Sequence, residues 1–343
     1  NFNNFINSIK KIVAQIDFKT LIIIQTTVPP GTTNELIKPI VDGHIKKNSF
    51  SNDMINLAYS FERVMPGKFY LDSIINNWRV IGSDSKKASK EAKNFFSKFI
   101  NIKKYPITIL ESTQAAEFTK ILENSYRAAN IAFIEEWSRL AEGMGIDIYK
   151  IIDAIKIRHT HSNISKPGLG VGGYCLTKDP LFGKIAARKI YGYRNMPFPI
   201  STKSIEINRK MPLETIKLLK NNIKNYKTKK IGLFGLSYKE DVGDLRFSPT
   251  LTIIRFLKRN HIEFSLHDPF FNKFENKNVS KYPNPALCDV LIFCVPHYEY
   301  KKINIGTFIK KHKPIIIDSF NVLTDKQINK LNKNQIEFLS IGR

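Results

Sequence analysis

The feature that most constrains the fold is a long helical stretch in the middle of the chain. Residues 112–142 contain neither Pro nor Gly, and their apolar side chains recur at helical spacing until Gly143 and Gly145 end the pattern. On both sides of this stretch, short apolar runs alternate with helical patterns, which predicts parallel sheets. We therefore expect an α/β protein in which two parallel-sheet domains are joined by a helical region containing one long helix.

The part before the long helix has the pattern of a sheet with connecting helices. Residues 5–16 and 88–99 each place apolar side chains on one helical face, and Ser83 or Asp84 is expected to cap the second of these helices. Runs rich in β-branched residues predict strands at residues 20–25, 54–59, 80–81 and 106–110.

Two polar residues lie just past the ends of the first two predicted strands. Thr27 is in the loop TTVPPGTT, and Glu62 is in the loop ERVMPGK. Ligands bind at the carboxyl ends of strands in open α/β sheets, so both residues are candidate ligand contacts. Ordinary turn chemistry is the better explanation from these two residues alone.

The part after the long helix begins with further helices and then returns to alternation. Asp147 is expected to cap a helix over residues 148–158, and further helices are predicted from about Pro180 and over residues 200–222. A second α/β unit of nucleotide-binding size follows. Its elements are predicted strands at residues 231–235, 264–266, 290–295 and 314–317, with a helix at residues 251–260.

The composition excludes several classes of protein. Of 343 residues, 54 are Lys or Arg and 30 are Asp or Glu, which gives a formal net charge of +24. The lysines are spread along the chain and only 12 of the basic residues are Arg, so nucleic-acid binding is not expected. The longest apolar runs fall far short of the ~18 residues that a membrane span needs. Three scattered cysteines cannot form a disulfide framework, which fits a reducing, cytoplasmic compartment.

The segment GVGGYCLTKDP, residues 170–180, carries the most specific local signal. Glycines allow a ligand to approach the backbone closely, and Cys175 follows them just before a predicted helix. A helix N-terminus and the ammonium of Lys178 would both favour a thiolate, and Asp179 is placed to orient a water or relay a proton. The alternative is a small buried cysteine in a turn, and spacing alone favours it.

Lys120 and Asn124 are four residues apart and therefore lie on one face of the long helix. If both pointed into a site, an ammonium and an amide could stabilise an oxyanion. A solvated Lys and a partly exposed Asn are the better explanation from helical spacing alone.

A second glycine-containing loop, GLSYKEDVGDLRFSP at residues 235–249, follows a predicted strand. Its Lys239 and Arg246 indicate a phosphate-facing loop, although it lacks the spacing of a P-loop. His159 and His161 have no Cys or acidic partner at ligand spacing, so no metal site is predicted.

The first α/β part lacks the usual dinucleotide signature. Such a domain normally opens with a strand, a G-x-G-x-x-G turn and a helix, followed about 20 residues later by an acidic residue. Residues 1–111 contain no such turn. Either an opening βαβ unit of roughly 80–90 residues is missing from this chain, or the part never bound a dinucleotide.

Taken together, five motifs resemble the nucleotide-sugar 6-dehydrogenase family, whose members oxidise UDP-glucose or GDP-mannose, and most closely the UDP-glucose type. The motifs TTVPPGTT, SFERVMPG, EFTKILENSYRAANIAF, GVGGYCLTKDP and GLSYKEDVGDLRFSP occur in the family's order over nearly the whole chain. The resemblance implies three parts. These are the remainder of a Rossmann-like NAD domain truncated at its N-terminus (1–111), a central helical dimerisation and catalytic region (112–226) and a Rossmann-like UDP-binding domain (227–343).

The resemblance also implies the chemistry. C6 of a UDP-sugar, with UDP-glucose as the first expectation, would undergo two NAD-dependent oxidations through a cysteine thiohemiacetal and thioester, and water would release the uronate. Structural roles are then no longer preferred for the polar residues above. Six residues would carry the reaction: the nucleophile Cys175, the oxyanion donors Lys120 and Asn124, the water-positioning or proton-relaying Asp179 and Thr27, and Glu62, which would assist thioester hydrolysis.

Binding residues are implied in the same way. Thr27, Lys178 and Arg246 would contact NAD, the last two at its phosphates. Arg158 would reach the substrate of a neighbouring subunit in a homodimer. The UDP-sugar would be contacted by Glu62, Arg63, Val64, Met65, Lys120, Arg158, Ile164, Ser165, Lys166, Pro167, Gly168, Gly172 and Lys239.

Some positions depart from the family pattern. Pro66 stands where relatives often have an acidic residue near the cofactor, and Phe320 stands where some have a nucleotide-contacting Arg. Lys178 in CLTKDP is closer to the UDP-glucose type than to the N-acetylhexosamine type. Two alternatives remain open: a UDP-N-acetylhexosamine 6-dehydrogenase, and a UDP-sugar-binding fragment without NAD-dependent activity.

Overall fold

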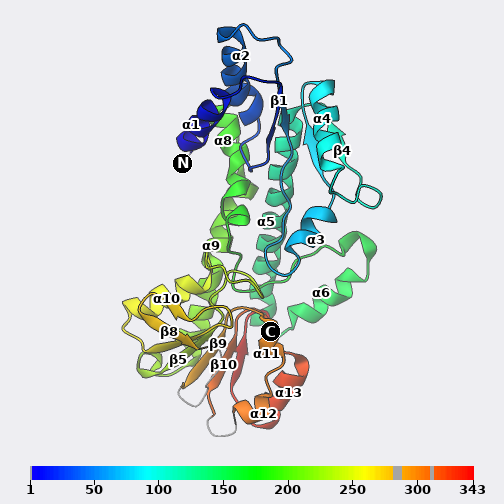
Figure 1. The fold of residues 1–343 in the computed structure, drawn as a ribbon. Helices are drawn as coiled ribbons and strands as arrows, with labels where there is room; N and C mark the ends of the chain where they lie inside the picture. Colours follow the sequence, from blue (N-terminus) through cyan, green and yellow to red (C-terminus); the bar gives the residue numbers. More distant parts are fainter. Residues whose placement is uncertain (1, 281–287, 310–312) are drawn as a thin grey trace. The chain divides into compact units, whose positions relative to one another are not determined.

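The computed structural model describes residues 2–280, 288–309 and 313–343, and the chain divides into two compact units. The predicted long helix is α5 (Thr113–Gly143), which contributes residues to both units (Figure 1). The first unit consists of Asn1–Tyr126 and Lys178–Pro199, and the second consists of Arg127–Thr177 and Ile200–Arg343.

The first unit is a sheet with helices on both faces. Besides part of α5, its elements are α1 (Phe2–Val13), β1 (Thr20–Ile24), η1 (Thr32–Ile37), α2 (Lys38–Lys47), β2 (Ile55–Tyr59), α3 (Tyr70–Ile75), β3 (Val80–Gly82), α4 (Lys86–Phe96), β4 (Thr108–Leu110), η3 (Asp179–Leu181) and α8 (Phe182–Lys189). The strands pair in the order β1-β2-β3-β4. Side chains alternate between the two faces: Ile22 and Ile24 pack with α1 and α2, and Leu21 and Ile23 pack with α4.

One strand pair differs from the predicted parallel arrangement. β1 and β2 are parallel, as are β3 and β4, but β2 and β3 are antiparallel and pair at Tyr59 and Gly82. The guanidinium of Arg79 is buried, donates to the carbonyl of Phe61 and forms a 2.7 Å ion pair with Glu62. Arg79 thereby holds the start of β3 beside the carboxyl end of β2. From this point β3 runs antiparallel to β2.

One of the two predicted N-terminal helix caps is confirmed, and the other is wrong. Asp147 caps α6 (Ile148–Lys156) by accepting hydrogen bonds from two backbone N–H groups, as predicted. The cap of α4 is Ser85, which accepts from the N–H of Ala88. The predicted caps Ser83 and Asp84 are therefore wrong: the Ser83 hydroxyl donates to the carbonyl of Leu57 and accepts from the N–H of Ser85, which lies before the helix.

The second unit contains, among the described residues, a seven-stranded sheet in the order β11-β10-β9-β5-β6-β8-β7. Its elements besides α5 and α6 are η2 (His159–His161), most of α7 (Cys175–Lys178), α9 (Pro199–Asn222), η4 (Tyr226–Thr228), β5 (Ile231–Phe234), α10 (Thr250–Arg259), β6 (Phe264–His267), β7 (Lys273–Phe274), β8 (Lys277–Ser280), β9 (Val290–Phe293), α11 (Tyr298–Lys301), α12 (Ile305–Phe308), β10 (Ile315–Asp318), α13 (Asp325–Lys333) and β11 (Phe338–Ser340).

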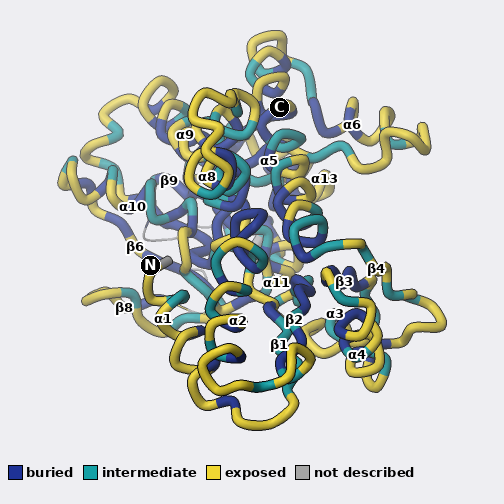
Figure 2. Tube along the Cα trace, turned by 90° about the horizontal axis from the view of Figure 1, so that it is seen from above, coloured by how far each residue is buried: buried dark blue, intermediate teal, exposed yellow. Residues whose placement is uncertain are grey.

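The central strand β9 shows how this sheet is covered. Val290 and Ile292 pack with α9 and α10, whereas Leu291 and Phe293 pack with α11, α12 and α13. Helices therefore shield both faces of the sheet from water at β9, which explains why this strand is apolar at every position. Figure 2 shows exposed turns of helices such as α6 in yellow around this buried interior. The predicted domain boundaries at residues 111 and 226 stay a prediction.

In the described part of the chain, no helix is long and apolar enough to span a membrane. Nor do the described residues include a group of three or more His, Cys, Asp or Glu side chains that could hold a metal ion.

Two glycines provide a test of the backbone. Gly235, directly after β5, has φ of 101°, and a Cβ there would lie 2.5 Å from the Cβ of Val295. We expect Gly235→Ala to lower the free energy of unfolding by about 2–4 kcal/mol, measured by urea denaturation.

Gly43 is the matched control, because it lies inside α2 and a Cβ there would meet nothing within 4 Å. Gly43→Ala should raise stability by about 0.5–1 kcal/mol. Equal effects of the two substitutions would contradict the backbone described here.

Candidate active site

A carboxylate without solvent exposure lies at the end of α7. Asp179 is 0% exposed. Its Oδ2 accepts a hydrogen bond from Nδ2 of Asn124 at 2.8 Å, and its Oδ1 pairs with Nζ of Lys178 at 2.6 Å. The structure thus brings together two of the predicted catalytic residues, Asn124 and Asp179. Because Asn124 donates one N–H to Asp179, the orientation of its amide is fixed and its second N–H is left for another acceptor.

Lys120 lies on the same helix, one turn before Asn124, and is buried. Its Nζ is 5.3 Å from the centroid of the Phe61 ring, a cation–π distance. A buried ammonium beside a buried amide is the arrangement that the oxyanion prediction requires within this unit. Cys175 belongs to the second unit, so its approach to Lys120 and Asn124 stays a prediction.

Glu62 is held on both carboxylate oxygens. Oε2 pairs with Arg79 at 2.7 Å, and Oε1 accepts from the backbone N–H of Arg63 at 2.7 Å. The Arg63 side chain itself pairs with Glu123 at 3.0 Å and donates to the carbonyl of Trp78. Glu62 therefore anchors the loop after β2. Of the other residues predicted in this loop, Val64 is half-buried and Met65 is exposed, with its N–H donating to Ser73.

The loop after β1 is organised by Glu117 of α5. The Glu117 carboxylate accepts from the N–H groups of Gly31 and Thr33 at 2.6 and 2.9 Å, and from the Thr33 hydroxyl. Burial raises the pKa of Glu117 to about 7, although these hydrogen bonds oppose the shift. Thr27 lies half-buried in the same loop.

The edge formed by these two loops fits a polar ligand such as the nicotinamide nucleotide of NAD. Thr26 is exposed and Thr27 half-exposed at the carboxyl end of β1. At the end of β2, the Ser60 hydroxyl is buried and has no hydrogen-bond partner in the described part of the chain. Carboxyl ends of strands are where dinucleotides bind in such sheets.

Cys175 is the first residue of α7, and it is exposed, whereas Cys288 and Cys294 are buried. α7 has only four residues, so it offers little of the helix dipole that the sequence suggested. The spacing G-x-G-x-x-G does occur in the chain, at Gly168, Gly170 and Gly173, but in the loop before Cys175. That loop follows η2 and not a strand, so it is not a dinucleotide turn.

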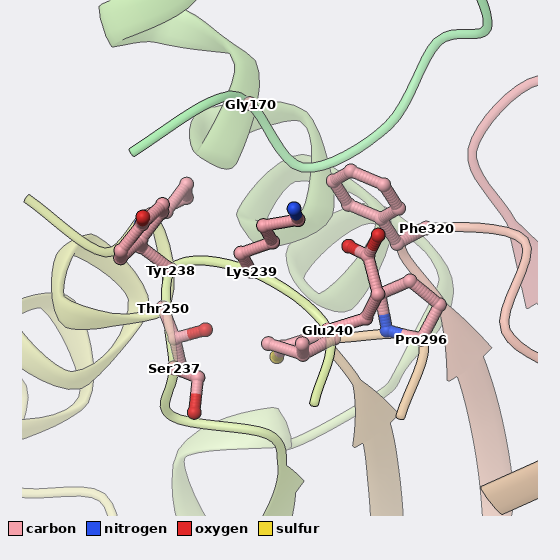
Figure 3. A pocket seen from close by; sticks show the side chains of 11 residues that line it. Gly170, Ser237, Tyr238, Lys239, Glu240, Thr250, Pro296 and Phe320 are labelled. Carbon is pink, nitrogen blue, oxygen red and sulfur yellow. The ribbon is translucent and has the colours of Figure 1, made fainter. Parts of the chain in front are cut away.

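The predicted phosphate-facing loop, which connects β5 to α10, lines a pocket. The side chain of Lys239 points toward the segment that carries Gly170, with Tyr238 on one side and Phe320 on the other (Figure 3). The N-terminus of α10 adds Thr250 to the lining. The lining also includes Glu240, so it presents one ammonium and one carboxylate beside a helix N-terminus and aromatic rings, on which a planar base can stack.

The predicted substrate segment, residues 164–168, is fastened to α5 and α6. Asn130 accepts from the N–H of Ser165 at 2.9 Å and donates to the carbonyl of Asn163 at 3.0 Å. Tyr149 donates to the carbonyl of Pro167 at 3.3 Å. Gly168 packs against the ring of Phe320, which joins this segment to the pocket. Ile164 is half-buried, Lys166 pairs with Asp153, and Arg158 is exposed.

The two cations predicted for the NAD phosphates are engaged within the protein. Arg246 forms a bidentate pair with Asp244 and lies 4.9 Å from the ring centroid of Tyr174. Lys178 pairs with Asp179 and lies over the ring of Phe182. Gly172 is buried against Tyr238 and Phe247.

Sequence reasoning did not assign roles to Arg79, Glu117, Asn130 and Asp268. Asp268 could have been found from the sequence, because an acidic residue directly after a strand often lies where ligands bind at the edge of the sheet. Its carboxylate accepts from the N–H groups of Leu236 and Ser237 and so shapes the phosphate-facing loop. Asn130 gave no such signal, because an amide on a helix is equally common on the surface.

Models of three domains match the chain in order. The NAD binding domain of the UDP-glucose/GDP-mannose dehydrogenase family matches residues 1–100, the central domain matches residues 114–210, and the UDP binding domain matches residues 232–325. The chain belongs to this family. By family it is an NAD-dependent nucleotide-sugar dehydrogenase, with the α/β fold expected from its sequence.

Several relatives have finer names. The UDP-N-acetyl-D-mannosamine dehydrogenase of Methanococcus vannielii is 33% identical over 93% of this chain and 70% of that protein. The same enzyme from Methanococcus aeolicus is 35% identical over 93% of this chain and 68% of that protein. The solved structure of the UDP-N-acetyl-D-mannosamine dehydrogenase of Pyrococcus horikoshii has a TM-score of 0.81 at 27% identity, and covers 100% of this chain and 77% of that chain.

These comparisons correct two expectations. The relatives' names favour the N-acetylhexosamine type, which was the alternative expectation, over the UDP-glucose type. Residues 1–100, which were expected to be only the remainder of an NAD domain, are matched as the family's NAD binding domain. The alternative of a fragment without NAD-dependent activity is therefore not supported.

The raised pKa of Glu117 predicts a pH dependence of stability. The folded protein binds this proton more tightly than the unfolded chain, so the stabilisation is complete below pH 4.5 and is lost as the pH rises through about 7. Glu117→Gln keeps the shape and cannot titrate. Relative to this variant, the wild type should lose about 2 kcal/mol of unfolding free energy between pH 5 and pH 8, measured by urea denaturation. Parallel curves for the two proteins would contradict the assignment.

Proposed function

We propose that the protein oxidises C6 of a UDP-N-acetylhexosamine, UDP-N-acetylmannosamine foremost, to the carboxylate by two successive NAD-dependent oxidations through Cys175. The observation that carries the proposal is the buried pair of Asn124 and Asp179, with Lys120 one helical turn away. Cys175, four residues before Asp179 in the sequence, is exposed. The names of the relatives support the choice of an N-acetylhexosamine.

The residues account for the covalent steps. NAD, when bound, would accept the hydrides that leave C6. The thiolate of Cys175 adds to the aldehyde carbon formed by the first oxidation, so a C–S bond forms and the carbonyl oxygen becomes an oxyanion. Lys120 and the second N–H of Asn124 donate hydrogen bonds to that oxygen. The second oxidation leaves a thioester on Cys175.

Hydrolysis of the thioester assigns a role to Asp179. Water attacks the thioester carbon while the carboxylate of Asp179 takes one of its protons, the C–S bond breaks, and the uronate leaves as the thiolate is restored. Thr27 is assigned to the nicotinamide side of the site. Glu62 is assigned a positioning role, because Arg79 and the N–H of Arg63 already hold its oxygens.

The nucleotide is assigned to the pocket of the second unit. Lys239 would pair with the diphosphate, and residues 164–168 would close over the uridine and sugar from the other side, with Gly172 nearby. Arg246 and Lys178 would reach the phosphates of NAD only by exchanging their present carboxylate partners. All three cysteines are free thiols, which fits the cytoplasm as the place of action.

We also propose a homodimer formed through α5. Three large apolar side chains of this helix, Phe133, Trp137 and Leu140, are half-exposed at helical spacing, and Met144 directly after the helix continues the stripe. An apolar stripe of this length on a helix is typical of an interface between subunits. The exposed Arg158 is then available to a neighbouring subunit.

Substrate preference tests the proposal directly. We expect kcat/KM for UDP-N-acetylmannosamine to exceed that for UDP-glucose at least tenfold, measured by NADH formation. Cys175→Ala should abolish uronate formation while UDP binding, measured by calorimetry, stays within threefold of wild type. Two NADH per uronate from Cys175→Ala would exclude the covalent route, and a preference for UDP-glucose would exclude the substrate assignment.

The oligomer has its own test. Trp137→Glu places a charge in the exposed stripe of α5, so sedimentation equilibrium should show a dimer for the wild type and a monomer for the variant. Leu213→Glu, a half-exposed residue of α9, is the control and should remain dimeric. A monomeric wild type, or a dimer unaffected by Trp137→Glu, would contradict the interface.

A further inference from the structure

Two loops of the second unit are in direct contact beside Cys175. The cysteine loop, residues 168–174, leads into Cys175, and the nucleotide loop, residues 235–249, contains Lys239. The backbone N–H of Gly173 donates to the carbonyl oxygen of Arg246 at 2.8 Å. The segment that carries the proposed nucleophile is therefore bonded to the segment that carries the proposed diphosphate ligand.

The contact depends on the absence of side chains at two glycines. A Cβ on Gly172 would lie 2.6 Å from the carbonyl oxygen of Phe247 and 2.6 Å from the Cβ of Tyr238. Gly173 has φ of 74°, and a Cβ there would lie 3.0 Å from the ring of Tyr238. Residues larger than Gly would force the two loops apart.

Aromatic side chains extend the contact toward Cys175. Tyr174, which precedes Cys175, meets Phe247 edge-on with ring centroids 5.3 Å apart. Phe247 has φ of 53°, a conformation that is costly for an aromatic residue and persists only where its surroundings hold it. The Tyr238 ring lies against Gly173, two residues before Cys175.

The nucleotide loop is itself firmly held. Asp268, 0% exposed, accepts from the N–H groups of Leu236 and Ser237 at 2.7 and 3.1 Å. Nearer the tip of the loop, the N–H of Asp241 donates to Nδ1 of the buried His297 at 3.0 Å. Lys239 therefore lies on a loop that is held on both sides, at Leu236 and Ser237 and at Asp241.

We propose that Tyr238 and Phe247 are positioning residues for Cys175, and that UDP bound beside Lys239 fixes the thiol through the contact between the two loops. The inference rests on the proposed function for the identity of its ligand. The consequence is a fixed sequence of events: Cys175 takes its reactive position only after the nucleotide end of the substrate has bound.

Alkylation of Cys175 measures this coupling without NAD or a sugar. Because Cys288 and Cys294 are buried, iodoacetamide should modify Cys175 selectively. Saturating UDP should slow the alkylation of the wild type at least fivefold. In Phe247→Asn, whose side chain tolerates the left-handed backbone but has no ring, UDP should bind with a Kd within threefold of wild type and slow alkylation less than 1.5-fold.

Two further variants complete the experiment. Phe247→Tyr keeps the ring and should retain the fivefold protection. Tyr298→Asn removes an exposed ring that packs on Lys302 of the same unit, so it serves as the matched control and should also retain protection. Undiminished protection in Phe247→Asn would overturn the proposal, since UDP would then be covering the thiol directly.

Hydrogen exchange separates this inference from the proposed function. Should calorimetry detect no UDP binding, the proposed function fails, and the nucleotide-free proteins still decide whether the loops are coupled. The amide of Gly173 should exchange at least tenfold faster in Gly172→Ala and in Phe247→Asn than in wild type, because its hydrogen bond to Arg246 is weakened. Unchanged exchange in both variants would contradict the role of the contact.

Discussion

The nucleotide-binding part of the structure depends on the hydrogen bonds that the buried carboxylate of Asp268 accepts. This carboxylate accepts hydrogen bonds from the backbone after β5 and from His297, whose Nε2 lies 3.2 Å away. Although burial alone would raise it, the hydrogen bond to His297 keeps the pKa of Asp268 below its ordinary value. In a dinucleotide-binding unit an acid at this strand end faces the ribose. Here it holds the protein's own loop, and we propose that side chains such as Lys239 bind the ligand instead.

In the first unit, too, a buried carboxylate accepts hydrogen bonds from the backbone of a loop that follows a strand. Glu117 occupies the N–H groups of the loop after β1, where a free helix N-terminus would otherwise attract an anion. In both units an internal carboxylate replaces the phosphate as the partner of backbone donors. We therefore propose that side chains, and not these backbone donors, supply the contacts to bound ligands.

The sequence predicted the elements whose pattern is set by burial. β9 and β10 are apolar at nearly every position because both faces of the sheet are covered, and α5 contains no Pro and no Gly before its last residue, Gly143. It did not predict the short and largely polar strands β8 and β7, of which β7 lies at the edge of the sheet. It also missed the antiparallel direction of β3, and the ion pair between Arg79 and Glu62 beside the start of that strand has no pairing signal in the sequence. The motifs singled out Asn124 and Asp179, which the fold brings into contact, whereas the roles of Asn130 and Glu117 in holding loops are defined only by the folded chain.

The account stands on a covalent bond between substrate and Cys175, which mass spectrometry of the quenched enzyme detects most directly. With Asp179→Asn slowing hydrolysis, protein stopped with acid during turnover of UDP-N-acetylmannosamine and NAD should carry the uronyl group as a thioester on the peptide that contains Cys175. Accumulation of uronate with no adduct on that peptide, or with the adduct on another residue, would contradict the account.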